Sequence, residues 1–230
     1  MTLSPDQWII WNIGPFAINA TLVFTWIIMA ALIVAAGLAR LQILRIRKWA
    51  MFLETIIVAV QNQIEQIAPG QSHRYLPFIA TLFLFILSSA LISIVPGCRA
   101  PTASLSTTTA LAIAVLVAVP VFTITASGPL AYLRQYAQPT VFMLPFNIIG
   151  ELSRTIALAV RLYGNMMSGA VLAAILVSIA PFFFPVLMQG IGLLTGVIQA
   201  YIFAVLATVY IASAGAQSQP SKSTRESSHG

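Results

Sequence analysis

Long uncharged stretches are the feature of this sequence that most restricts its fold. Phe16–Ala39 contains no charged residue, and four later stretches contain few or none. A helix needs roughly 20 apolar residues to cross a bilayer core of about 30 Å. Hydrophobic residues make up 59% of the 230 residues and charged residues 7%, whereas soluble domains are about 25% charged. The sequence therefore predicts an all-α polytopic membrane protein and excludes both a soluble enzyme and a disordered chain.

The apolar stretches divide the chain into one membrane domain with polar ends. We expect an outer N-terminal segment over residues 1–15, a membrane domain over 16–214 and a polar cytoplasmic tail over 215–230. About five transmembrane helices are predicted, over residues 16–39, 75–95, 108–125, 146–179 and 182–214. The last two are longer than a perpendicular crossing requires, so we expect both to be strongly tilted.

One further helical stretch, residues 49–67, has too many polar side chains for a lipid-facing span. These side chains are Glu54, Gln61, Asn62, Gln63, Glu65 and Gln66. Helices with one polar and one apolar face lie in the membrane interface. We therefore expect residues 49–67 to form an interfacial amphipathic helix.

The basic residues, which give a net charge of +6, predict the orientation of the chain. Cytoplasmic loops of membrane proteins are enriched in Lys and Arg. With five spans and the N-terminus outside, only Arg99 falls on the outer side. The cytoplasmic side receives Arg40, Arg45, Arg47, Lys48, Arg74, Arg134, Lys222 and Arg225. This orientation, with the C-terminus in the cytoplasm, explains most of the basic excess without a nucleic-acid partner.

The sequence contains no cluster typical of metal or cofactor binding. His73 and His229 are far apart, and Cys98 is the single cysteine. Phosphate-binding loops, nucleophile elbows and dinucleotide fingerprints are also lacking. We expect no metal, no cofactor and no catalytic site of the chain's own.

Arg161 lies within the fourth predicted span, with Thr155–Val160 before it and Leu162 and Tyr163 after it. An arginine at the centre of a membrane helix costs about 2.5–3.5 kcal/mol on insertion scales. The same helical face is expected to carry three more polar side chains, Arg154, Asn165 and Ser168. The last span offers a matching polar face, formed by Gly192, Thr195, Gly196 and Gln199.

Two interpretations of Arg161 remain open. In the first, a carboxylate of the same chain holds it in a purely structural ion pair, although the candidates are few. Of these, Glu151 lies three residues from Arg154 and would pair with it first, which leaves Glu54 and Glu65. Alternatively, the permanently charged guanidinium attracts a carboxylate on another subunit, a task for which arginine is suited because it does not release its proton.

Three separated motifs resemble one known family. Residues 151–166, ELSRTIALAVRLYGNM, resemble the signature of subunit a, the membrane stator of the Fo sector of F-type ATP synthases. Residues 199–210, QAYIFAVLATVY, are similar to that family's final helix, and residues 96–108, PGCRAPTASLSTT, to its connection before the third span.

The resemblance implies that the last two helices embrace a rotating ring of c subunits. Two aqueous half-channels would reach the ring from opposite sides, and Arg161 would release the ion from the ring carboxylate and block direct leakage. Asn165, Gln199, Glu151, Arg154, Ser168 and Thr195 are the expected residues of the ion pathway. The implied partners are the c-ring, the b-subunit peripheral stalk, the F1 sector indirectly, the lipid bilayer and H⁺ or Na⁺. The motif style and the tail after Gln217 indicate the inner membrane of a bacterium.

Two positions depart from the family pattern. Many relatives carry Glu or His nine residues after the arginine and seven before the glutamine, where this chain has Ala170 and Gly192. Neither side chain ionises, so a proton relay through these positions is lacking. This would suit a Na⁺-coupled member, but the c subunit largely selects the ion, and the choice between H⁺ and Na⁺ stays open.

Two other functions compete with the stator. A self-contained secondary transporter would show internal repeats and paired broken helices, and five spans divide poorly into two halves. An assembly protein without an ion path would leave the buried arginine unexplained.

Overall fold

The computed structural model describes residues 9–13, 16–40, 47–93, 100–129, 143–179 and 184–217. Six α-helices and one short hairpin make up most of this part of the chain. The elements in order are β1 (Ile9–Ile13), β2 (Phe16–Asn19), α1 (Ala20–Arg40), α2 (Arg47–Ile67), α3 (Ser72–Ile92), the 3-10 turn η2 (Pro101–Ala103), α4 (Leu105–Ser127), α6 (Met143–Ile179) and α7 (Phe184–Gln217). The predicted helical membrane fold is confirmed.

Four helices of the described chain are long and apolar enough to cross a membrane: α3, α4, α6 and α7. A shorter apolar stretch, Thr21–Gly37, lies in α1. At 1.5 Å per residue, the 37 residues of α6 and the 34 of α7 extend about 55 and 51 Å. Both lengths exceed a hydrocarbon core of about 30 Å, so the strong tilt remains our expectation for these two helices in a bilayer.

Several predicted boundaries differ from the helices observed. The first span was predicted from Phe16, but Phe16–Asn19 forms strand β2, which pairs antiparallel with β1, and the helix begins at Ala20. Pro145 precedes the predicted span 146–179 but lies in the first turn of α6, where a missing N–H costs no helical hydrogen bond. Residues 94–95 and 182–183 of the predicted spans lie outside the described residues.

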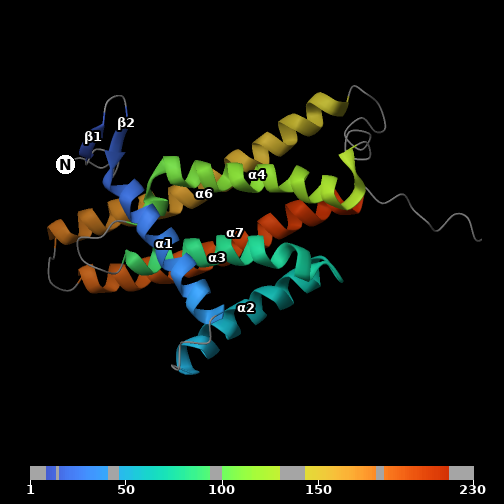
Figure 1. Cartoon of the computed structure of the whole chain (residues 1–230). Coiled ribbons are helices and arrows are strands. Elements are labelled where there is room, and N and C mark those ends of the chain that lie inside the picture. Colours follow the sequence, from blue (N-terminus) through green and yellow to red (C-terminus); the bar gives the residue numbers. More distant parts are fainter. Residues whose placement is uncertain are drawn as a thin grey trace, which may run out of the picture.

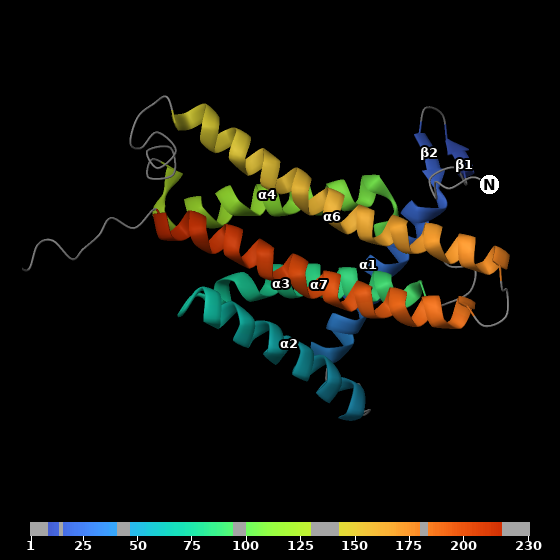
Figure 2. The ribbon, with the colours of Figure 1, turned by 180° about the vertical axis from the view of Figure 1, so that it is seen from behind.

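The long helices lie lengthwise beside one another, and α1 crosses them steeply (Figure 1). Seen from behind, α6 and α7 run side by side with α3 and α4 on their far side (Figure 2). Helix α7 packs against α2, α3, α4 and α6. The core is formed by fully buried side chains such as Ile86, Leu162 and Phe203. The last helix is therefore held from several sides, whereas an apolar 18-residue stretch of α6 is only 6% buried.

The turn between α2 and α3 is closed by Glu65, near the end of the predicted amphipathic helix. Its Oε1 accepts a 2.8 Å hydrogen bond from the N–H of Gly70. Gly70 has φ of 75°, a left-handed conformation that glycine adopts at little cost. Hydrogen bonds from the Ser72 hydroxyl and from this N–H lower the pKa of the Glu65 carboxyl below its ordinary value. The carboxylate thereby fixes the direction in which α3 leaves α2.

Helix α7 approaches α3 closely at Gly196. A Cβ added there would lie 2.5 Å from the Cβ of Ala90 and 3.5 Å from Cε of Met166. Only glycine allows this backbone approach. Two glycines of α6, Gly164 and Gly169, have no atom of the described chain within 4 Å of an added Cβ.

We predict that Gly196→Ala destabilises the protein by about 1–3 kcal/mol, because the added methyl overpacks the α3–α7 contact. Thermal unfolding of the purified protein in detergent measures the effect. Gly190→Ala on the same helix is the matched control, because an added Cβ meets nothing within 4 Å there. It should be neutral or stabilise by up to about 1 kcal/mol. Equal melting temperatures for both variants would contradict the close approach.

Candidate functional site

Two polar contacts fix the register of α6 against α7. Asn165 Nδ2 donates a 3.5 Å hydrogen bond to Gln199 Oε1. The second contact lies nearer the start of α6 and the end of α7. There, Cζ of Arg154 lies 5.6 Å from the centroid of the Tyr210 ring, within the range of a cation–π interaction. On each helix, the two residues that make these contacts are eleven positions apart, which is about 16 Å along the helix axis. The helices run antiparallel, so the two contacts lie at opposite ends of one interface.

The first contact belongs to a set of four predicted pathway residues, which we term the Asn165–Gln199 group: Asn165, Ser168, Thr195 and Gln199. Gln199 is 5% exposed and Asn165 half-buried. The Ser168 hydroxyl donates to Asn165 O at 3.2 Å, and that of Thr195 to Ile191 O at 2.8 Å. Within the described residues, Gln199 Nε2 is buried without a hydrogen-bond partner. Buried polar atoms are nearly always satisfied, so this amide is suited to bind water.

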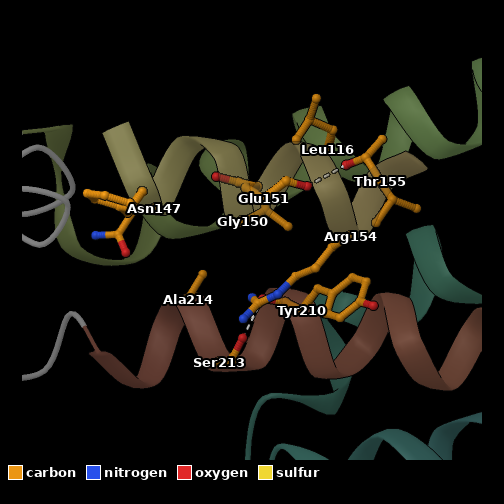
Figure 3. Close-up of a pocket in the computed structure, with 12 residues that line it drawn as sticks. Leu116, Asn147, Gly150, Glu151, Arg154, Thr155, Tyr210, Ser213 and Ala214 are labelled. Carbon is orange, nitrogen blue, oxygen red and sulfur yellow. Dashed lines mark hydrogen bonds between the residues drawn. The ribbon is translucent and has the colours of Figure 1, made fainter. Parts of the chain in front are cut away.

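The second contact lies in a pocket of about 340 Å³ between α4, α6 and α7. Five of its polar side chains, which we term the Glu151–Arg154 group, are Asn147, Glu151, Arg154, Tyr210 and Ser213. In Figure 3, Arg154 extends from α6 across the pocket toward Tyr210 and Ser213 on α7. The Thr155 hydroxyl donates to the backbone oxygen of Glu151 at 3.0 Å. Charged and hydroxyl groups therefore gather in one cavity.

Arg161 lies between the two groups on α6, seven residues from Arg154 and four from Asn165. Its side chain is exposed, on a helical face that also exposes Ala157, Gly164 and Ser168. Within the described residues, no ion pair or hydrogen bond is found for Arg161. A structural ion pair inside the chain, one of the two interpretations of its sequence, is therefore not observed in the described part.

The structure brings the predicted site residues together in two places rather than one. Glu151 and Arg154 share the pocket, and Asn165, Ser168, Thr195 and Gln199 form the other group. Sequence reasoning missed Tyr210, Ser213 and Asn147. The sequence gives no separate signal for Tyr210, because its contact with Arg154 depends on the register of α6 against α7. No group of side chains that could hold a metal ion is found in the described ranges.

Comparison with known proteins identifies similar chains along the whole length. The family model described as ATP synthase A chain matches residues 21–212. "ATP synthase subunit a 2" of Acaryochloris marina is 51% identical over 234 residues, which cover 100% of this chain and 100% of the relative. "ATP synthase subunit a 1" of Prosthecochloris aestuarii is 52% identical, covering 93% of this chain and 97% of the relative. "ATP synthase subunit a" of Albidiferax ferrireducens is 51% identical, with coverages of 93% and 94%.

The contact between Arg154 and Tyr210 gives a prediction for stability. Tyr210→Leu should lower the unfolding free energy by about 0.5–1 kcal/mol more than Tyr210→Phe, because phenylalanine keeps an aromatic face for the guanidinium. A double-mutant cycle with Arg154→Gln, read by thermal unfolding, isolates the pairwise energy. Strictly additive effects of Tyr210→Leu and Arg154→Gln would show that the two side chains do not interact.

Proposed function

The chain belongs to the ATP synthase A chain family, and on that premise we propose that it forms two ion half-channels against a ring of c subunits. Ion movement through these half-channels is coupled to rotation of the ring. The observation that carries the proposal is the position of Arg161, exposed on α6 between two separate polar groups. A single continuous channel would need no fixed positive charge along its path. Two half-channels require a barrier between them, and the charge of Arg161 supplies it.

The exposed face around Arg161 is suited to close contact with another helix. Ala157, Gly164 and Ser168 are small, and an added Cβ at Gly164 would meet no atom of the described chain within 4 Å. Small residues let membrane helices approach closely. We infer that the c-ring packs on this face and presents its carboxylates to Arg161.

The chemistry assigned to Arg161 follows from its permanent charge. At 4 Å and an effective dielectric constant of 20, its attraction for a ring carboxylate is about 4 kcal/mol. This attraction favours the ion-free carboxylate, so the bound ion leaves as its site arrives at Arg161. Past the arginine, the next ion binds and the ring site moves back into lipid.

The two groups are assigned to opposite sides of the membrane by the distribution of basic residues. With the N-terminus outside, α6 enters from the cytoplasm and α7 returns to it. The Glu151–Arg154 group then lines the cytoplasmic half-channel, and the Asn165–Gln199 group lines the outer one. The b-subunit stalk and, through it, the F1 sector are further partners, and the location is the inner membrane of a bacterium.

The transported ion is H⁺ or Na⁺, and the outer half-channel supplies the argument for choosing between them. The side chains of its group are amides and hydroxyls. Ala170 and Gly192 occupy positions where many relatives carry an ionisable Glu or His. Hard cations such as Na⁺ bind neutral oxygen atoms, whereas a proton relay uses groups that titrate. These residues favour Na⁺.

We predict that Arg161→Ala reduces ATP-driven ion transport by about 100-fold or more in a correctly assembled complex, since an attraction of about 4 kcal/mol is lost. Transport is measured in liposomes containing the whole purified complex. Arg225→Gln, which removes the same charge from the C-terminal tail, is the control and should transport normally. Normal coupled transport by assembled Arg161→Ala would overturn the mechanism.

The same liposomes identify the ion. ATP-driven uptake of radioactive sodium that persists or rises with a protonophore shows primary Na⁺ transport. Acidification without sodium uptake shows proton transport, and Glu151 is then the first residue to test as a relay.

A further inference from the structure

Between the two polar groups, most of the buried side chains of α6 and α7 are apolar. Four side chains, which we term the apolar layer, have exposures of 2% for Leu158 and 0% for Leu162, Phe203 and Ala207. All four belong to one hydrophobic core cluster. The interface thus changes along its length from polar to apolar and back to polar.

The register of the helices places the apolar layer between the groups. On α6, Leu158 and Leu162 lie between Arg154 and Asn165, the residues that contact α7. On α7, Phe203 and Ala207 lie between the corresponding partners, Gln199 and Tyr210. Residues three or four apart share one helical face, so Arg154, Leu158 and Asn165 form one stripe and Gln199, Phe203 and Tyr210 the facing one.

Hydroxyl groups near the layer do not bridge it. Thr155 donates to Glu151 O at 3.0 Å, and Thr208 donates to Ala204 O at 2.8 Å. Both hydroxyls are therefore directed to the backbone of their own helix. Behind the layer, Ile86 of α3 and Val115 of α4 are 0% and 2% exposed and continue the same cluster.

We propose that the apolar layer is an ion seal inside the chain, separate from Arg161. This inference rests on the proposed function of the two polar groups as half-channels. An ion or its hydrating water would lose its hydrogen-bond partners among these four side chains, as at the apolar constrictions of channels. Arg161 blocks passage along the exposed face of α6 toward the ring. The apolar layer blocks the shorter route through the subunit, so ions cross only on the ring.

The test is passive ion flux through the whole complex in liposomes, driven by a membrane potential without ATP. Leu162→Asn places an amide in the layer and should raise the flux at least tenfold. The gradient that ATP supports should fall, while ATP hydrolysis continues at or above the wild-type rate. Ile211→Asn is the matched control, because Ile211 is 1% exposed on α7 but lies beyond Tyr210, outside the layer. It should destabilise the complex without raising the flux.

Leu158→Gln is the second variant if Leu162→Asn fails to assemble, since glutamine is close to leucine in volume and its amide reaches beyond the backbone of its own helix. A flux raised in a layer variant and not in Ile211→Asn supports the seal. Wild-type flux in an assembled layer variant, or the same leak in Ile211→Asn, overturns it. A wild-type complex that pumps no ion with ATP would overturn the proposed function itself, and this result is distinct from the flux of the layer variants.

Discussion

A permanent positive charge in the middle of a long membrane helix is the constraint on which the arrangement depends. A guanidinium there is costly unless it has a counter-charge or a polar cavity. The described chain offers Arg161 neither an ion pair nor burial, and places it on a face of small residues. Within the described residues the charge is thus unsatisfied, and under the proposed function a carboxylate of the c-ring completes it. The proposed coupling to a moving ring rests on this incompleteness.

The remaining structure keeps that charge between the two polar groups. Helix α7 is fixed by the close contact at Gly196 and by the polar contacts of Gln199 and Tyr210 with α6. A further 2.7 Å hydrogen bond from the Tyr201 hydroxyl to Gln63 joins α7 to the amphipathic helix α2. Because α7 is held on several faces, its polar and apolar positions stay aligned with those of α6. The alternation of polar group, apolar layer and polar group depends on this alignment.

The sequence predicted the individual helices, and it left open the contacts between segments that are far apart in the chain. Five apolar stretches and the amphipathic segment were found because hydropathy is read along the chain. The hairpin was missed because Phe16–Asn19 continues the apolar run of α1, although Gly14-Pro15 is a turn signal. Glu151, Arg154, Asn165 and Gln199 were selected individually. These residues form two groups, and Tyr210 belongs to one of them. This grouping depends on the antiparallel register of α6 against α7, which the sequence of neither helix encodes alone.

The central claim is that the two groups open to opposite sides of the membrane. The most direct measurement is labelling by a membrane-impermeant thiol reagent in inside-out and right-side-out vesicles, with Cys98 replaced by Ser. Ser213→Cys in the Glu151–Arg154 group should react only from the cytoplasmic side, and Ser168→Cys in the Asn165–Gln199 group only from the outer side. Reaction of both cysteines from the same side would contradict the account of two half-channels separated at Arg161.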